Sequence, residues 1–167
     1  MRGSSAARRW VDVTERAIYL RSIPVAAELP TRVLHAVAHS MVDREFEPGE
    51  KLLEAGRPAS HLELLTSGKI ELRKGDVKLG EMVPPQSVGF LNILGRNEAA
   101  YDAVAVEPVQ ALELSAERFY DLLEDYYPLL VATLRYAAQR LLAEMQELPQ
   151  EALGLPDRKS ARLNSSH

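Results

Sequence analysis

The sequence contains no cysteine, and this absence excludes several kinds of chemistry. The chain can form no disulfide, no thiolate metal site and no cysteine nucleophile. The phosphate-binding loop G-x-x-x-x-G-K-S/T, the G-x-S-x-G elbow of serine hydrolases and the H-E-x-x-H zinc motif are also absent. No motif marks a catalytic residue, and we predict that the protein is not an enzyme.

Long apolar runs are missing as well. No stretch approaches the roughly 20 apolar residues that a membrane-spanning helix needs. The first residues are basic through Arg2, Arg8 and Arg9, but the apolar segment of a secretory signal does not follow them. A cytoplasmic location is the resulting expectation. The net charge of -4 gives no general attraction to nucleic acid, and neither nucleic acid nor a membrane is expected as a partner of this chain alone.

What is present is typical of one globular domain. The 167 residues are 46% hydrophobic and 26% charged, which suffices to bury a core. We expect a mobile leader over residues 1–13 and a domain over 14–148. Apolar residues at helical spacing predict a first helix over 14–23, limited by Pro24, and a second over 30–41.

From residue 44 the pattern changes to short strands separated by turn residues. In residues 69–73 apolar and charged residues alternate strictly, which places the two apolar side chains inward. Two further strands are predicted over 103–106 and 109–114. Because no helices alternate with the strands, we predict an α+β, mainly β fold with an antiparallel jelly-roll (double-stranded β-helix) barrel over about 44–114. Four glycines in or beside the breaks are expected to take positive φ angles: Gly49, Gly56, Gly68 and Gly75.

Helices return after the strands and complete the domain over residues 115–148. Ser115 is a suitable N-cap for a helix over 116–124, and a long helix follows over 128–148. The long helix carries a seam of apolar residues every three or four positions. Two interpretations of the seam stay open: it packs on the protein's own barrel, or it joins two copies as a homodimer. The seam consists of Leu130, Leu134, Ala137, Leu141, Met145 and Leu148.

The last residues differ in composition. Residues 149–167 are polar and aperiodic after a proline and a glycine, and we expect them to be disordered. Residues 157–167, DRKSARLNSSH, resemble the translation of sequencing-adapter DNA and are left out of the fold prediction. If they are such an artefact, the natural chain continues beyond the long helix, and its output function can lie in the missing part.

The order of these elements resembles the cyclic-nucleotide-binding domain family, which includes the sensor half of the catabolite activator protein and the regulatory domains of cyclic-nucleotide-dependent kinases and channels. The resemblance covers residues 17–145. Its sharpest parts are the F-E-P-G-E turn at 46–50, residues 54–56, and the Ser67–Gly68 pair before a strand. The resemblance implies a regulatory or interaction module that binds a small ligand and needs no cofactor.

Members of this family bind the cyclic phosphate with a cassette that reads roughly F-G-E-x-A-L-L, followed by R-x-A-T before a strand. The cassette aligns without a gap with residues 88–105. In the family the glycine lets the backbone approach the ligand, the glutamate holds the ribose hydroxyl and the arginine pairs with the phosphate. Here the glycine is retained, but phenylalanine, alanine and aspartate stand at the glutamate, arginine and threonine positions. The resemblance implies these ligand-binding positions: Gly89, Phe90, Leu91, Asn92, Ala99, Ala100 and Asp102.

The lost arginine decides what ligand we expect. Removing one partner of a buried charge pair costs about 2 to 5 kcal/mol, or roughly 30-fold to several thousand-fold in affinity. Arg96 is the only cation between residues 89 and 105, where Glu98 and Asp102 bring the charge to -1. Arg96 would have to swing inward to contact a phosphate. We predict a degenerate cassette that does not bind cAMP or cGMP in the family manner. The alternative is the sensor half of a catabolite-activator-type transcription regulator whose helix-turn-helix is missing from this chain.

Other polar residues carry weaker hypotheses. His35 and His39 stand four apart on the second predicted helix, and a metal enzyme on a jelly roll would need this pair or His61. No third histidine or cysteine is near the pair, so we predict no metal site. Three acids are interpreted as isolated side chains on solvated strand faces: Glu63, Glu71 and Glu81.

Overall fold

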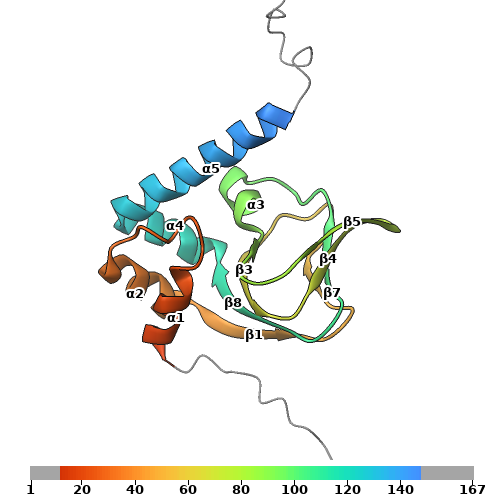
Figure 1. Cartoon of the computed structure of the whole chain (residues 1–167), viewed down its shortest axis with the longest axis horizontal. Helices are drawn as coiled ribbons and strands as arrows, with labels where there is room; N and C mark the ends of the chain where they lie inside the picture. The colour runs from red at the N-terminus through yellow and green to blue at the C-terminus, as the bar shows by residue number, and fades with distance from the viewer. Residues whose placement is uncertain (1–11, 148–167) are drawn as a thin grey trace, which may run out of the picture.

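A computed structural model of the chain describes residues 12–147 (Figure 1). The tail predicted over 149–167 and most of the leader predicted over 1–13 lie outside these residues, so what was said of them stays a prediction. The predicted boundary between the leader and the first helix is one residue too late, because Val13 already belongs to the helix. Among the described helices, none is both long and apolar enough to cross a membrane.

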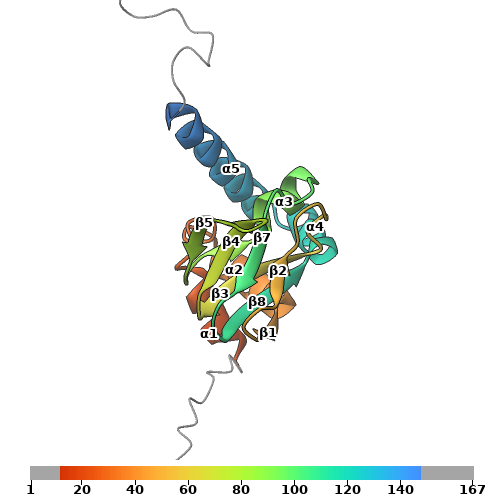
Figure 2. The same cartoon turned by 90° about the vertical axis from the view of Figure 1, so that its right-hand side faces the viewer.

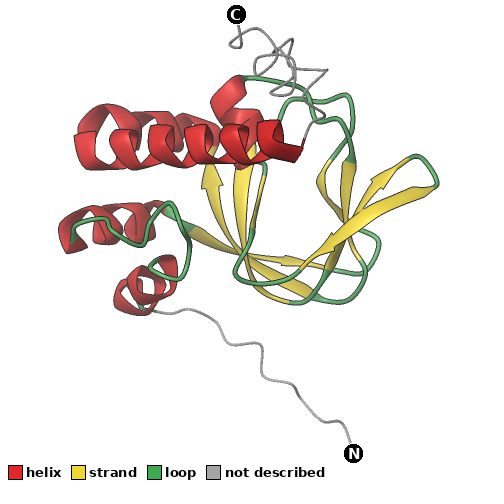
Figure 3. Cartoon of the chain, turned by 45° about the horizontal axis from the view of Figure 1, so that its top comes forward, coloured by secondary structure: helices red, strands yellow, loops and turns green. Residues whose placement is uncertain are grey.

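The two N-terminal helices are confirmed with small changes at their ends. Helix α1 is Val13–Leu20, and it begins earlier than predicted because the Asp12 carboxylate, rather than the Thr14 hydroxyl, caps it. That carboxylate accepts a hydrogen bond from the Thr14 amide at 3.0 Å. Helix α2, Thr31–Ser40, follows Pro30 directly. Both helices pack on one side of the strands, as the view in Figure 3 shows.

The strands form two antiparallel sheets of four strands each, which confirms the predicted jelly-roll fold. The first sheet has the order β1 (Val42–Phe46), β8 (Val109–Ser115), β3 (His61–Ser67) and β6 (Ser87–Val88). The second has the order β2 (Lys51–Leu53), β7 (Asp102–Ala105), β4 (Ile70–Lys74) and β5 (Val77–Met82). The four glycines predicted to have positive φ angles all have them.

The first sheet is covered on both faces. Leu62 and Leu64 of β3 join the core that the helices form, whereas Leu65 of the same strand joins a second core between the sheets. That second core is completed by residues of the opposite sheet, such as Ile70 and Ala103. Because both faces of β3 are buried, the strand carries the consecutive apolar residues of a fully enclosed strand.

The ligand-cassette region contains one short helix, which contacts the two C-terminal helices. The short helix α3, Phe90–Gly95, connects β6 to β7, and α4, Ala116–Asp125, follows β8 directly. As predicted, the Ser115 hydroxyl caps α4 by accepting a hydrogen bond from the Arg118 amide at 3.2 Å. The long helix α5, Tyr127–Glu147, lies beside α3 and α4 (Figures 1 and 2).

The face of helix α5 that packs against the rest of the domain is not the predicted seam. Leu129 and Thr133 are its buried residues. Of the seam, Leu134 and Leu141 are 56% and 59% exposed, and Met145 is also exposed. The interpretation that the whole seam packs on the protein's own barrel is therefore wrong for these residues. The last seam residue, Leu148, lies outside the described chain.

Candidate functional site

Gly89 holds the turn from β6 into α3, as the cassette alignment predicts. Its φ angle is +86°, in the left-handed region that favours glycine. A Cβ atom at this position would lie 2.6 Å from the carbonyl oxygen of His61 on β3. The turn therefore requires glycine both for its conformation and for its close approach to the neighbouring strand.

Phe90 faces the helices. Its side chain is buried and makes edge-to-face contacts with Phe119 of α4 and Tyr136 of α5, at centroid distances of 5.7 and 5.4 Å. The residue at the family's glutamate position thus joins α3 to both C-terminal helices. It offers no hydrogen-bond acceptor to a ribose hydroxyl.

Ala99 lies in the core between the two sheets and is 4% exposed. Its backbone is fixed by Arg57, whose carbonyl accepts from the Ala99 amide at 2.9 Å, and by Gly56, whose amide donates to the Ala99 carbonyl at 2.8 Å. Its neighbour Ala100 is exposed. The residue that the predicted alignment places at the family's arginine position is therefore a small side chain in an apolar core.

Asp102 does not repel a phosphate from inside the cassette, because its carboxylate is held by the adjacent strand β2 and by the segment that follows it. One oxygen accepts a hydrogen bond from the Ala55 amide at 2.8 Å, and the other lies 3.1 Å from the Lys51 ammonium. The amide and the ammonium hold the pKa of Asp102 below its usual value. Asp102 has a local structural role in joining β7 to β2.

Arg96 is also directed elsewhere. It ends α3 with a φ angle of +53°, and its guanidinium lies over the ring of Tyr120 in α4, 5.3 Å from the ring centroid. The Tyr120 hydroxyl in turn donates to the carbonyl of Ile93. These contacts fix the end of α3 to α4, and they do not present Arg96 to a ligand.

A cleft of about 600 Å³ lies at the start of α3, between β4, β5 and α5. Its volume is within the range of small-molecule sites. Of the predicted site residues, the structure places four in its lining: Gly89, Phe90, Leu91 and Asn92. Ala99, Ala100, Asp102 and Arg96 are not among its lining residues. Sequence reasoning missed the rest of the lining, which comes from the segment after α1, from β4, β5 and the residues that follow β5, from the approach to β7 and from α5: Ser22, Ile23, Pro24, Leu72, Met82, Pro85, Gln86, Ser87, Tyr101, Tyr136 and Arg140.

A polar cluster that was not predicted lies on β3 and its neighbours. Glu63 is 3% exposed, so its assignment to a solvated strand face is wrong. It pairs in register with Glu113 of β8, whose carboxylate lies 3.1 Å from the Arg44 guanidinium and 3.8 Å from the His61 ring. Burial, reinforced by the hydrogen bond and charge of Glu113, raises the pKa of Glu63 to about 9. Glu63 is therefore protonated at neutral pH.

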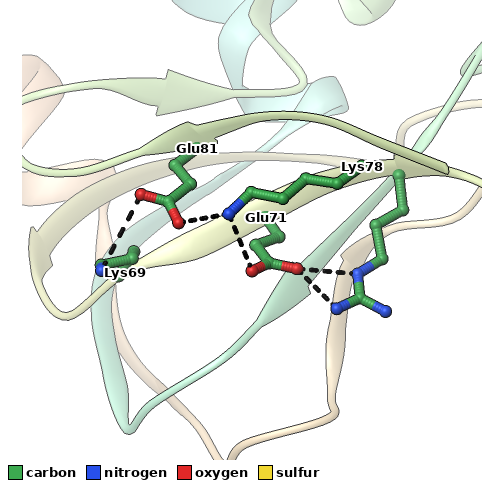
Figure 4. A network of polar contacts seen from close by, with 5 residues as sticks. Lys69, Glu71, Lys78 and Glu81 are labelled. Atoms are coloured by element: carbon green, nitrogen blue, oxygen red, sulfur yellow. Dashed lines mark hydrogen bonds and ion pairs between the residues drawn. The ribbon is translucent and has the colours of Figure 1, made fainter.

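The other two acids do lie on the strand surface, but they are not isolated. The Lys78 ammonium lies 3.2 Å from Glu71 and 2.5 Å from Glu81, and Arg73 also bonds to Glu71 (Figure 4). Lys69 lies 3.8 Å from Glu81 on its other side. These ion pairs connect β4 to β5 and lower the pKa of both carboxyl groups.

The histidines form no metal centre in the described part of the chain. Within residues 12–147 there is no group of three or more histidine, aspartate and glutamate side chains that could hold a metal ion. His61 instead contacts the Ser60 hydroxyl at 2.8 Å.

Comparison with known proteins identifies the family. The profile of the cyclic nucleotide-binding domain matches residues 43–126, half of the 167 residues. Glutaminase 2 from Bradyrhizobium diazoefficiens is 34% identical over 114 residues, which are 67% of this chain and 18% of that protein. An uncharacterized NTE family protein from Mycobacterium tuberculosis is 25% identical over 132 residues, or 78% of this chain and 22% of that protein. The chain thus spans about a fifth of the length of the curated relatives that it matches.

Solved structures show the same fold. The N-terminal domain of a transcriptional regulator from Streptomyces coelicolor superimposes with a TM-score of 0.67 at 24% identity, over 81% of this chain and 94% of that one. The regulatory subunit of a cAMP-independent protein kinase A from Trypanosoma brucei superimposes with a TM-score of 0.61 at 21% identity, over 82% of this chain and 49% of that one. The jelly roll, the glycine turn before α3 and the family profile lead to one conclusion: this chain belongs to the cyclic nucleotide-binding domain family.

Proposed function

We propose that this chain is a cytoplasmic regulatory or interaction module that does not bind cAMP or cGMP in the manner of its family, and that it is not an enzyme. One observation carries the proposal: the position of the phosphate-binding arginine is a buried alanine. In the described chain, no cation of the cassette lines the cleft. A cyclic phosphate would have to leave water without the charged partner that the cassette provides in the family, which is costly in a protein interior.

A related fold supports this proposal. The kinase regulatory subunit from Trypanosoma brucei is described as cAMP-independent, and a triple mutant that includes a threonine-to-arginine change is bound to cAMP in its A site. The cAMP-bound form of that protein thus carries an added arginine, together with two substitutions to alanine. The chain studied here has no arginine at the cassette position.

Isothermal titration calorimetry with cAMP and cGMP tests the proposal. We expect no saturable heat at micromolar concentrations, because loss of the arginine alone weakens a micromolar ligand to about millimolar. Circular dichroism of the same sample confirms that the protein is folded. Saturable micromolar binding of either nucleotide would overturn the proposal.

We also propose that α5 joins two copies of the chain. Leu134, Leu141 and Leu142 are each more than half exposed, and Met145 extends the same apolar surface. Exposed apolar residues in a row on one helix typically mark a contact with another helix. A homodimer through this helix would remove them from water.

Light scattering after size-exclusion chromatography tests the dimer. We expect a dimer for the unmodified chain and a folded monomer for the double variant Leu134→Glu and Leu141→Glu. Val77→Glu is the matched control, since Val77 is 63% exposed on β5, away from α5. A strict monomer at high micromolar concentration contradicts this proposal.

A second candidate function is the sensor half of a transcription regulator. It is favoured by the likeness to the N-terminal domain from Streptomyces coelicolor and to the sensor domain of the transcriptional regulator DNR from Pseudomonas aeruginosa, which has a TM-score of 0.62. Sequencing the source gene beyond codon 156 tests it. About 60 to 80 further residues with a basic recognition helix are expected. A stop codon shortly after α5 would remove this candidate.

A further inference from the structure

The cleft beside α3 has an unusual charge distribution. Among the described residues that line it, only Arg140 of α5 is charged. No aspartate or glutamate is part of that lining. The cleft therefore presents one positive charge that no lining acid neutralises, and an anion is the kind of group that would be attracted to it.

Arg140 is available to a ligand. Its side chain is 53% exposed, and its one ion pair within the described chain is with Glu144, at 3.8 Å, one turn further along α5. An exposed pair at this distance contributes little to stability and can be exchanged for another partner. A guanidinium group can donate two parallel hydrogen bonds to a carboxylate, which gives such a contact both strength and orientation.

The rest of the cleft is apolar or neutral. Leu72 of β4 and Met82 of β5 line it from the second sheet, and the ring of Tyr136 lines it from α5. The hydroxyl groups of Tyr101 and Tyr136 make no hydrogen bond with another residue of the described chain. These two groups are free to donate to a polar atom of a ligand, while the aliphatic side chains suit an apolar body.

We propose that this cleft binds a small organic carboxylate with an apolar body, and that Arg140 holds the carboxylate. The proposal rests on the proposed function, because it requires that the cassette itself provides no phosphate site. In this site the contact with the anion comes from α5, whereas the family's arginine contact comes from the segment before β7. A ligand bound in this way contacts both the second sheet and α5.

Fluorescence with anilinonaphthalene sulfonate as a reporter tests the proposal, with phenylbutyrate as the competing ligand. Phenylbutyrate has a carboxylate and an aromatic body, and phenylbutyramide has the same shape without the charge. We expect phenylbutyrate to displace the reporter at concentrations roughly tenfold to a hundredfold below those that phenylbutyramide needs, as for the loss of one charged hydrogen-bond partner.

Two α5 variants locate the carboxylate contact. Arg140→Ala should weaken phenylbutyrate roughly tenfold to a hundredfold and leave phenylbutyramide unchanged. Arg140→Lys should recover part of the loss. Arg135→Ala is the matched control, because Arg135 is 59% exposed on the same helix but lines a different cleft, where it pairs with Glu28. Both arginines are on the surface, so their variants are expected to fold.

The possible outcomes separate this proposal from the proposed function. Equal competition by the acid and the amide, no competition by either, or an Arg140→Ala variant with unchanged affinity would overturn the carboxylate site. None of these results would affect the absence of cAMP binding, which calorimetry measures independently. Micromolar cAMP binding would instead overturn the proposed function.

Discussion

Glu63 is expected to make the free energy of unfolding fall as the pH rises. Its carboxyl group is buried between β8 and β6, and its pKa is raised from 4.5 to about 9. Between these two values the native protein holds a proton that the unfolded chain lacks. The resulting stability is fully present below about pH 4.5 and is lost as the pH rises through about 9.

The size of the effect follows from the number of protons released. One proton released on unfolding lowers the free energy of unfolding by about 1.4 kcal/mol per pH unit. From pH 5 to pH 8 the full effect is about 4 kcal/mol, which is a large part of the roughly 5 to 15 kcal/mol that stabilises a domain. This value is an upper limit, because it assumes that the native state holds one full proton more than the unfolded chain over the whole interval.

Urea unfolding followed by circular dichroism at several values between pH 5 and pH 8 measures this dependence. In Glu63→Gln the side chain is neutral at every pH, and its amide can donate to Glu113 as the protonated carboxyl does. We expect the variant to match the unmodified protein near pH 5 and to be more stable at pH 8. Glu45→Gln, on the exposed strand β1, is the control and should keep the original slope. Parallel curves for the unmodified protein and Glu63→Gln would refute the reasoning.

Three further predictions follow from the site. Gly89→Ala should destabilise the fold by about 1 to 3 kcal/mol, measured by urea unfolding, because of the positive φ angle and the contact with the His61 carbonyl; an unchanged midpoint contradicts this. Ala99→Arg should lower the melting temperature, and calorimetry should still detect no micromolar cAMP binding, since the new charge enters an apolar core. Lys78→Ala should raise the pKa of Glu71, which NMR titration measures. In the unmodified protein the lowered pKa of Glu71 stabilises the fold above the ordinary carboxyl pKa, and this stability is lost as the pH falls; the variant should have less of it to lose.

Local sequence patterns predict the helices and strands of the fold, because the spacing of apolar residues in each element depends only on residues close together in the sequence. Apolar periods predict the order of helices and strands, and the resemblance to the family's cassette implies a close backbone turn at Gly89. The exposure of Leu134 and Leu141 could not be read in this way. A seam of apolar residues shows that one face of a helix is apolar, but not which of two surfaces covers it.

A local sequence pattern also could not predict that both faces of a strand are buried. From the sequence alone, an isolated acid such as Glu63 on a predicted strand indicates a face in contact with water. The first sheet is enclosed by helices on one face and by the second sheet on the other, so Leu62, Glu63, Leu64 and Leu65 are all buried. Only the tertiary structure decides this, because the helices and the second sheet cover the two faces of β3, and the pairing of β3 with β8 within the first sheet brings Glu113 opposite Glu63.

In the candidate site, too, some features follow from the sequence and others only from the tertiary structure. The sequence by itself determined which residues stand at the positions of the predicted cassette alignment: glycine at 89, phenylalanine at 90 and alanine at 99. The tertiary structure decided where the remaining groups point: Phe90 into the helical core, Asp102 toward β2, Arg96 over Tyr120, and Arg140 along the cleft. Arg140 is 35 residues beyond the end of the cassette in sequence, and only the docking of α5 beside α3 brings the two together.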